Sequence, residues 1–169
     1  PAAIWAATRE VIGEVLDLAD APPGEVAAIG ITNQRSSIVA WDGPTGRPLS
    51  PLLVWQDTRG AERCRELQAR GFFITPMMAA SKAEWILGNV PETADAARAG
   101  RLRLGTPNAW LAACLCGDIN VSDHGNASAS FTPASARQSN PASQNPTRWI
   151  SPLFATPPPS GSTSEARPA

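Results

Sequence analysis

Two short apolar runs that lead into polar side chains constrain the fold of this chain most. Residues 26–32 (VAAIGIT) and 49–55 (LSPLLVW) are short and apolar, as expected for strands in a sheet. The first run leads into Asn33-Gln34-Arg35, and the second passes through Trp55 into Gln56-Asp57. Runs of this kind between helical patterns predict an α/β domain. Their polar ends need a structural or functional explanation.

Most of the rest of the chain, up to about residue 130, has apolar residues at helical spacing. They predict helices over 3–20, 59–70, 81–89, 92–99 and 106–116, so the second half of the domain is rich in helix. Residues 37–42 predict a further strand that pairs with 26–32, and 43–46 (GPTG) a turn that returns the chain into 49–55. Thr58 is expected to cap the helix that follows it, and Gly71 to end that helix.

The composition changes abruptly near residue 130. Residues 131–169 consist mainly of Pro, Ser, Thr, Ala, Asn and Gln with few charges, so they cannot bury enough apolar surface to offset the entropy of ordering. We therefore predict one folded domain over 1–130 and a disordered tail over 131–169. Such a change is also what an out-of-frame reading of GC-rich DNA produces, and we state a frameshift there as a hypothesis.

Charge and cysteine content exclude several broad classes of protein. The formal net charge is −1, which gives no reason to expect binding to nucleic acid or to an anionic membrane. The sequence has no apolar stretch long enough to span a membrane and no signal peptide, so we expect a cytoplasmic protein. Cys64, Cys114 and Cys116 match neither a zinc site nor a CxxC pair, and we interpret them as reduced, buried thiols.

Five segments in one collinear order resemble the N-terminal domain of the FGGY carbohydrate kinases, and within that family the glycerol kinases most of all. They are VAAIGITNQR; WD with TGRPL and VWQD; SKAEWILGNVPE; AGRLRLGTPNAWLAACLCGD; and VSDHGNASAS, and the resemblance as a whole covers residues 1 to about 130. The resemblance implies one part of an actin-like, ribonuclease H-like fold. It also implies a parent enzyme that uses Mg-ATP to phosphorylate a sugar or polyol and that is often a homo-oligomer.

The resemblance explains the polar ends of the two apolar runs as a sugar-binding wall. In doubly wound α/β sheets, ligands lie beyond the carboxyl ends of strands. A polyol needs several donors and acceptors and a flat apolar face, which Gln34, Arg35, Asp57 and Trp55 offer. Met77 stands where the family has a tyrosine that contacts glycerol. On residue types alone, an alternative remains open: Arg35 and Asp57 form a local ion pair and Trp55 belongs to the core.

Two departures from the family pattern make glycerol itself doubtful as the substrate. Ser36 stands where the glycerol kinases have a glutamate that holds a glycerol hydroxyl, and Met77 replaces the tyrosine. A site built to hydrogen-bond a small triol discriminates sharply when such groups are lost. The region before Pro76 is also about ten residues shorter than the family pattern. Another polyol or a ketopentose is an equally good candidate.

Catalytic, cofactor-binding and metal-binding residues cannot be assigned. The family's aspartate-glycine-threonine turn for Mg-ATP and its catalytic aspartate have no counterpart in the matching segments, and no Walker-type glycine loop replaces them. His124 beside Asp123 lacks the Gly-x-Ser-x-Gly elbow of a hydrolase triad. Asp42, Asp57 and Asp123 have no spacing that requires a metal.

Two functional hypotheses remain. In the first, the chain is part of a carbohydrate kinase, inactive in isolation, that contributes to the sugar side of the active site. In the second, it is a non-enzymatic remnant or a binding module. Both predict an exposed apolar edge near residues 26–32, because no strand N-terminal to it is present to pair with it, and therefore a tendency to aggregate.

Overall fold

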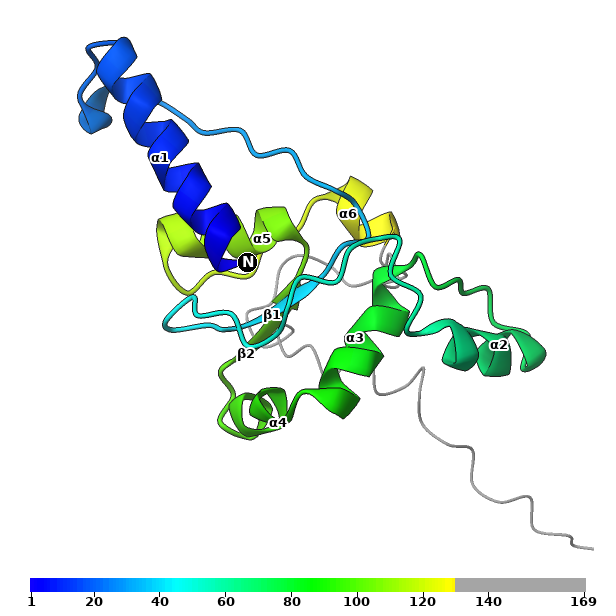
Figure 1. The fold of residues 1–169 in the computed structure, drawn as a ribbon. Coiled ribbons are helices and arrows are strands. Elements are labelled where there is room, and N and C mark those ends of the chain that lie inside the picture. The colour runs from blue at the N-terminus through cyan, green and yellow to red at the C-terminus, as the bar shows by residue number, and fades with distance from the viewer. Residues whose placement is uncertain (130–169) are drawn as a thin grey trace, which may run out of the picture.

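The computed structural model describes residues 1–129 and contains six α-helices, one short 3-10 helix and two strands among them. In chain order these are α1 (Ala2–Leu18), the 3-10 helix Pro23–Glu25, β1 (Val39–Asp42), α2 (Ala61–Ala69), α3 (Ala79–Asn89), α4 (Pro91–Arg98), β2 (Leu102–Gly105), α5 (Pro107–Cys116) and α6 (His124–Ala129). The architecture is mixed α and β, with a small sheet at its centre and a helix-rich second half (Figure 1).

Strand β1 organises the small sheet. It pairs antiparallel with β2, with Val39 opposite Gly105 and Asp42 opposite Leu102. On its other side the return segment makes only isolated bridges, one between Ile38 and Leu53 and one between Trp41 and Pro48. Pro48 and Pro51 lack the N–H group that a regular ladder would need, which explains why this segment is not a continuous strand.

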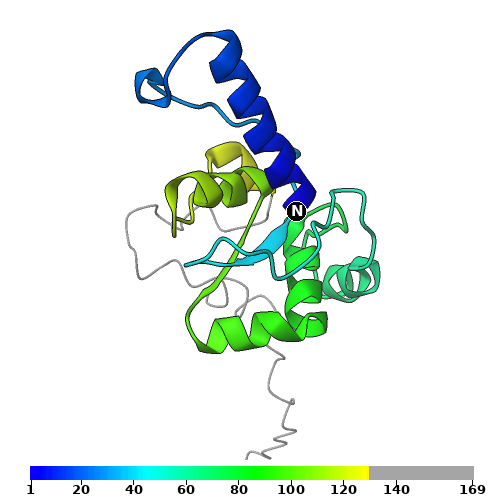
Figure 2. The same cartoon turned by 60° about the vertical axis from the view of Figure 1, so that its left-hand side comes forward.

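Successive side chains of β1 face two different sets of helices. Ile38 and Ala40 pack in a cluster with residues of α3, α4 and β2, whereas Val39 and Trp41 pack against α5. All four residues of β1 are buried, as expected for a strand covered on both faces. Figure 2 shows α5 and α6 on one side of the strands and α3 and α4 on the other. We call residues 33–129 the body of the molecule.

The turn after β1 is fixed by a buried carboxylate. Asp42 is 2% exposed, forms an ion pair with Arg101 and accepts a 3.0 Å hydrogen bond from the Thr45 hydroxyl. The Trp110 indole donates to the carbonyl of Gly46, which adopts a positive φ of 66°. The conspicuous WD and TG pairs of the sequence therefore have structural roles at this turn.

A third cluster joins α2 to α3. Cys64 and Leu67 of α2 pack with Ile74 and Ala80. Gly60, at the start of α2, lies so close to α3 that a Cβ there would come within 2.8 Å of the Ser81 Cβ. The absence of a side chain at Gly60 is therefore required for this contact.

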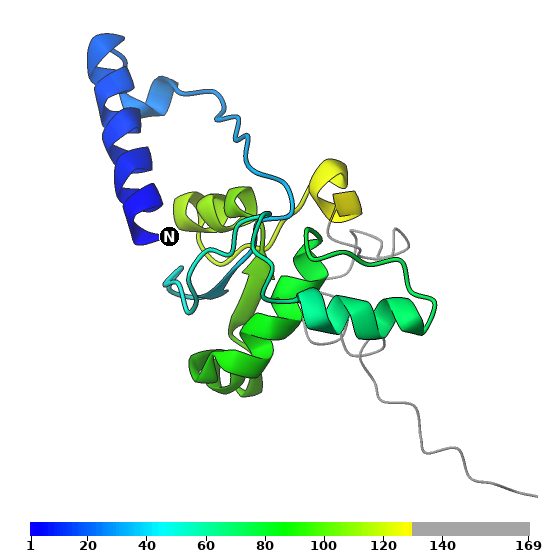
Figure 3. The ribbon, with the colours of Figure 1, turned by 45° about the vertical axis from the view of Figure 1, so that its right-hand side comes forward.

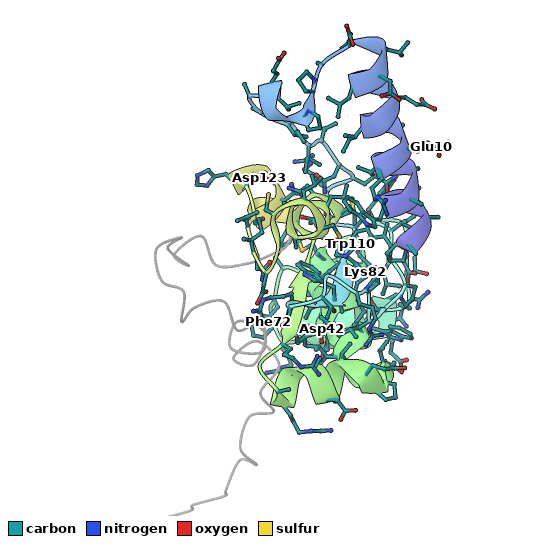
Figure 4. The ribbon with its side chains drawn as sticks, turned by 90° about the vertical axis from the view of Figure 1, so that its left-hand side faces the viewer. Glu10, Asp42, Phe72, Lys82, Trp110 and Asp123 are labelled. Carbon is teal, nitrogen blue, oxygen red and sulfur yellow. The ribbon has the colours of Figure 1, made fainter. Side chains whose placement is uncertain are left out.

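The first 32 residues extend away from the body, and we call them the arm. Figure 3 shows α1 extending away from the body. Helix α1 has no buried residue, and of its side chains only Trp5, near its start, packs against the core cluster that contains Trp41. Residues 26–32 run back towards the body without forming a strand and are almost all exposed. In Figure 4, Glu10 lies on this free helix, whereas Lys82 and Trp110 lie inside the body.

The structure confirms all five predicted helices to within two residues at every end. The predicted strands, in contrast, were partly wrong in their existence and in their pairing. Residues 26–32 are not a strand, because no described segment offers them hydrogen-bonding partners; the strand predicted at 37–42 exists but pairs with β2 instead. The prediction of a strand at 49–55 was wrong for the reason given above.

Other expectations from the sequence also need correction. The predicted Thr58 cap was wrong, since Gly60 is the N-cap of α2 and no side chain caps it. The thiols of Cys64, Cys114 and Cys116 are free, but only Cys64 is buried and Cys116 is exposed. The predicted disordered tail lies outside the described residues. No helix in the described part of the chain is long and apolar enough to cross a membrane.

Candidate functional site

Three turns of the body carry the five residues singled out by the sequence. The first contains Gln34 and Arg35, the second runs from Trp55 to Asp57, and the third runs from Pro76 to Met78. We refer to these three turns together as the candidate site. All three end or begin elements of the packed body, so their positions follow from β1, α2 and α3.

The first two turns are joined by Ser37. The Ser37 hydroxyl is completely buried, donates to the Gln34 side-chain oxygen at 3.3 Å and accepts from the Trp55 backbone N–H at 3.1 Å. One residue further along, Ile38 and Leu53 exchange two backbone hydrogen bonds of 2.9 Å. The polar ends of the two apolar runs therefore lie side by side.

Trp55 and Met77 are exposed apolar side chains within the candidate site. Trp55 is 42% exposed and Met77 is 53% exposed. Gln34 and Arg35 are exposed as well. The site thus offers both a flat aromatic surface and hydrogen-bonding groups to solvent.

The Trp55–Asp57 turn is anchored to the rest of the body through Arg59. Asp57 accepts hydrogen bonds from the Arg59 backbone N–H at 3.0 Å and from its guanidinium at 2.8 Å. The Arg59 guanidinium also lies over the Trp85 ring, 4.3 Å from its centroid. Since Trp85 belongs to α3, this helix supports the second turn.

Helix α3 also holds the third turn, through Lys82. The Lys82 side chain is completely buried, and its ammonium donates to the carbonyls of Pro76, Met77 and Met78 at 2.9, 2.7 and 3.1 Å. Ser81 donates to the Met78 carbonyl at 3.1 Å. The turn that presents Met77 is therefore tied to the helix that follows it.

The charges of Asp57 and Lys82 influence each other. Burial lowers the pKa of Lys82 to about 8, although the Asp57 carboxylate and Cys64 act in the opposite direction. Burial acts to raise the pKa of Asp57, but hydrogen bonds from Arg59 and the charges of Arg59 and Lys82 together hold that pKa below its usual value. Asp57 is therefore an ionised acceptor near neutral pH.

A polar network fixes the start of the first turn. The side-chain amides of Asn33 and Asn126 donate to each other's oxygen, at 3.4 and 3.2 Å, and Asn126 is 4% exposed. Asp123 accepts from the Asn126 backbone N–H at 2.9 Å and from the Asn108 side chain at 3.2 Å. The network connects the Gln34–Arg35 turn to α5 and α6 and gives Asp123 a structural role.

The alternative explanation for the polar side chains was wrong. Asp57 pairs with Arg59 and not with Arg35, and Trp55 is too exposed to be a core residue. The structure brings Gln34 next to the Trp55 backbone through Ser37. It also brings the turns of Asp57 and Met77 against one support, helix α3. Ser36 is buried and has a positive φ of 64°, so its side chain is not free to occupy the place of an exposed acceptor.

The residues that support the candidate site were not predicted from the sequence. Ser37, Lys82 and Asn126 are all buried, and each makes hydrogen bonds to one of the turns or beside it. Lys82 had a detectable signal, because it is the only lysine and lies on the same helical face as Ala79 and Ile86. Ser37 and Asn126 had no comparable signal in residue spacing.

Within residues 1–129 the structure shows no group of three or more His, Cys, Asp or Glu side chains that could hold a metal ion. His124 is exposed and begins the short helix α6. These observations identify no catalytic group among the described residues.

Comparison with known proteins identifies what this domain is similar to. The sequence model of the FGGY family of carbohydrate kinases, N-terminal domain, matches residues 1–133. Glycerol kinase from Mycoplasma capricolum is 39% identical over 134 residues, which cover 73% of this chain and 26% of that protein. Glycerol kinase from Halorhodospira halophila is 41% identical over 136 residues, covering 74% of this chain and 27% of that protein.

A solved structure of Plasmodium falciparum glycerol kinase with ADP is 34% identical, with a TM-score of 0.48, over 52% of this chain and 19% of that one. The chain therefore spans only about a quarter of the length of the curated relatives that it matches.

Proposed function

The chain belongs to the FGGY family of carbohydrate kinases, and from this premise we propose that it supplies part of the wall of a polyol-binding or sugar-binding site. The parent enzyme transfers the γ-phosphate of ATP to a hydroxyl of that substrate in the cytoplasm. Phosphoryl transfer depends on positioned phosphates, a metal and a base that accepts the hydroxyl proton. We propose that residues outside this chain provide these groups, so that the chain alone is inactive.

The observation that carries the proposal is the bridge made by Ser37. It places the amide of Gln34 beside the exposed Trp55 turn, which joins polar groups to a flat apolar face. A polyol is bound by this combination, because its hydroxyls need donors and acceptors while its C–H groups pack on an aromatic ring. Arg35, Asp57 and Met77 complete the proposed wall.

We assign no Mg-ATP site to the described residues. The acidic side chain of the candidate site, Asp57, accepts two hydrogen bonds from Arg59, and no acidic cluster accompanies it. Magnesium prefers oxygen ligands in octahedral geometry and keeps several waters. We propose the polyol side for this chain because of the Gln34, Ser37 and Trp55 arrangement described above.

Direct binding measurements with the purified chain test this proposal. A panel of glycerol, erythritol, xylulose and ribulose is titrated while the methyl signals of isotope-labelled methionine are followed by NMR; Met77 and Met78 are the only methionines. We expect at least one compound to shift the Met77 signal in a saturable way. No saturable shift with any of the four would contradict the proposed wall.

A radiolabelled ATP assay with the same panel tests the second part of the proposal. We expect no sugar phosphate from the isolated chain. Stoichiometric product would contradict the assignment of catalytic groups to residues outside it. It would also exclude the alternative that the chain is a non-enzymatic binding module.

A further inference from the structure

Lys82 is the most unusual buried side chain of the body. It is 0% exposed, it is the only lysine of the chain, and its ammonium donates to three consecutive backbone carbonyls. An ammonium has three N–H donors, so this arrangement satisfies all of them. Burying an unpaired charge is costly, and complete hydrogen bonding is the usual condition under which it occurs.

The three carbonyls belong to Pro76, Met77 and Met78, which form the third turn of the candidate site. A single cation that binds consecutive carbonyls draws them towards one point and so fixes the direction of the backbone between them. Met77, whose carbonyl accepts from the ammonium, is itself 53% exposed. The conformation of this turn is thus set by a residue that has no contact with solvent.

Helix α3, which carries Lys82, also supports the second turn, because the Arg59 guanidinium that binds Asp57 lies over the Trp85 ring, 4.3 Å from its centroid. The charge of the Asp57 carboxylate acts to raise the pKa of Lys82, against the larger effect of burial. Gly60 and Ser81 pack against each other beside it, which closes the space to water. A side chain without donors at position 82 would remove the ammonium from the carbonyls of Pro76 and Met77 in a region that water does not reach, whereas the Met78 carbonyl would still accept from Ser81.

We propose that Lys82 is a positioning residue that sets the relative placement of the Trp55–Asp57 turn and the Pro76–Met78 turn, and thereby the shape of the polyol-binding wall. The inference rests on the proposed function for the identity of the ligand. The geometric part depends only on contacts within this chain. Lys82 itself touches no substrate.

The two adjacent methionines provide a direct readout. Chain labelled with [13C-methyl]methionine gives two signals, both from the turn that Lys82 holds. Lys82→Leu removes the donors without adding a methionine. The matched control is Ile86→Ala, which lies one helical turn further along α3, is also completely buried and packs in the core cluster away from this turn.

We expect Lys82→Leu to move or broaden both methyl signals while Ile86→Ala leaves them near their original positions. Unchanged signals in Lys82→Leu, or equal changes in both variants, would overturn the inference. If Lys82→Leu does not fold, Lys82→Gln serves in its place, because its amide retains two donors and is expected to preserve part of the original spectrum.

Titration with the four polyols and sugars separates this inference from the proposed function. In the unmodified chain a saturable shift supports the polyol-binding wall, and its absence contradicts the proposed function alone. Where binding occurs, we expect Lys82→Leu to weaken it at least tenfold and Ile86→Ala to change it less than twofold. Equal affinity in Lys82→Leu and the unmodified chain would overturn the positioning role even if the methyl signals had moved.

Discussion

The arm and the body contain apolar patterns of similar quality but bury them very differently. In α1 the helical apolar residues stay exposed, with Val11 and Val15 both at 56% and Leu18 at 89%. In β1 every residue is buried. The two regions differ in what covers them, because β1 lies between two layers of helices whereas α1 meets the body only near Trp5.

This comparison separates two kinds of information in a sequence. Periodicity shows which face of an element is apolar, and both α1 and β1 obey it. Stabilisation arises only when another surface covers that face, since the hydrophobic effect scales with the apolar area removed from water. Burial of apolar side chains in the body therefore provides most of the stabilisation of the described chain, and the arm contributes little to it.

The largest expected effect comes from truncating the centre of the body. Trp41→Ala removes a completely buried ring and is expected to reduce the free energy of unfolding by about 3–5 kcal/mol. Leu18→Ala on the arm is expected to change it by less than about 0.5 kcal/mol. Urea titrations followed by circular dichroism measure both. Similar losses for the two variants would show that the α1 face is covered in solution.

A second test uses the pH dependence of stability within the body. The pKa of Lys82 is about 8 in the folded chain and about 10.5 in the unfolded chain, so between these values the unfolded state holds the proton more tightly. The contribution of Lys82 to the free energy of unfolding therefore rises with pH between about 8 and 10.5, by at most about 3 kcal/mol. Burial raises the pKa of Cys64 and Cys114, which acts in the opposite direction at the upper end.

Urea midpoints measured from pH 7.5 to 10 in the unmodified chain and in Lys82→Gln isolate the lysine contribution. The difference between the two curves is expected to grow in favour of the unmodified chain as the pH rises. A difference that is flat across the window would show that Lys82 titrates near its ordinary value.

Removing the arm is expected to have a smaller effect on the body. A chain that begins at residue 33 loses α1 and the contact of Trp5 with the core, but keeps Asn33 and its amide pair with Asn126. We expect a stability loss of at most about 2 kcal/mol, since only one partly buried side chain is removed from the core. Hydrogen exchange offers an independent check, with α1 amides expected to exchange much faster than those of α3.

The comparison also explains which parts of the fold could be predicted. Helices 79–89 and 107–116 were predictable because local spacing and terminal signals such as Pro91 and Gly117 define them. Strand pairing was not, because it depends on contacts between distant segments. The alternation of Leu102 and Leu104 with two arginines was the available signal for β2, and residues 26–32 had a good strand pattern but no partner.

In the candidate site, too, some residues could be predicted from the sequence and others could not. The exposed residues Gln34, Arg35 and Trp55 could be selected because polar groups after apolar runs stand out in a sequence. The buried hydrogen bonds of Ser37 and Lys82 could not, since a serine or a lysine has the same letter whether it faces water or a carbonyl. Residues that hold a site in place are therefore harder to predict than those that line it.

The smallest expected stability effect belongs to the exposed wall, and it provides the sharpest contrast with Trp41. Trp55→Ala is expected to change the free energy of unfolding by less than about 1 kcal/mol, because the ring is 42% exposed and its contact with Ser37 uses the backbone N–H, which alanine retains. Polyol affinity is expected to fall about tenfold or more, equivalent to about 1.4 kcal/mol.

Leu115→Ala is the control for this variant, since Leu115 is similarly exposed, at 37%, but lies on α5 outside the candidate site. Calorimetric titration with the tightest-binding member of the panel measures the affinities. A Trp55 variant that binds as well as the Leu115 variant would remove the flat apolar face from the proposed wall, because no other exposed aromatic side chain belongs to the three turns in the described residues. A Trp55 variant that loses binding but keeps its stability would instead show that the body separates residues that maintain the fold from residues that contact the ligand.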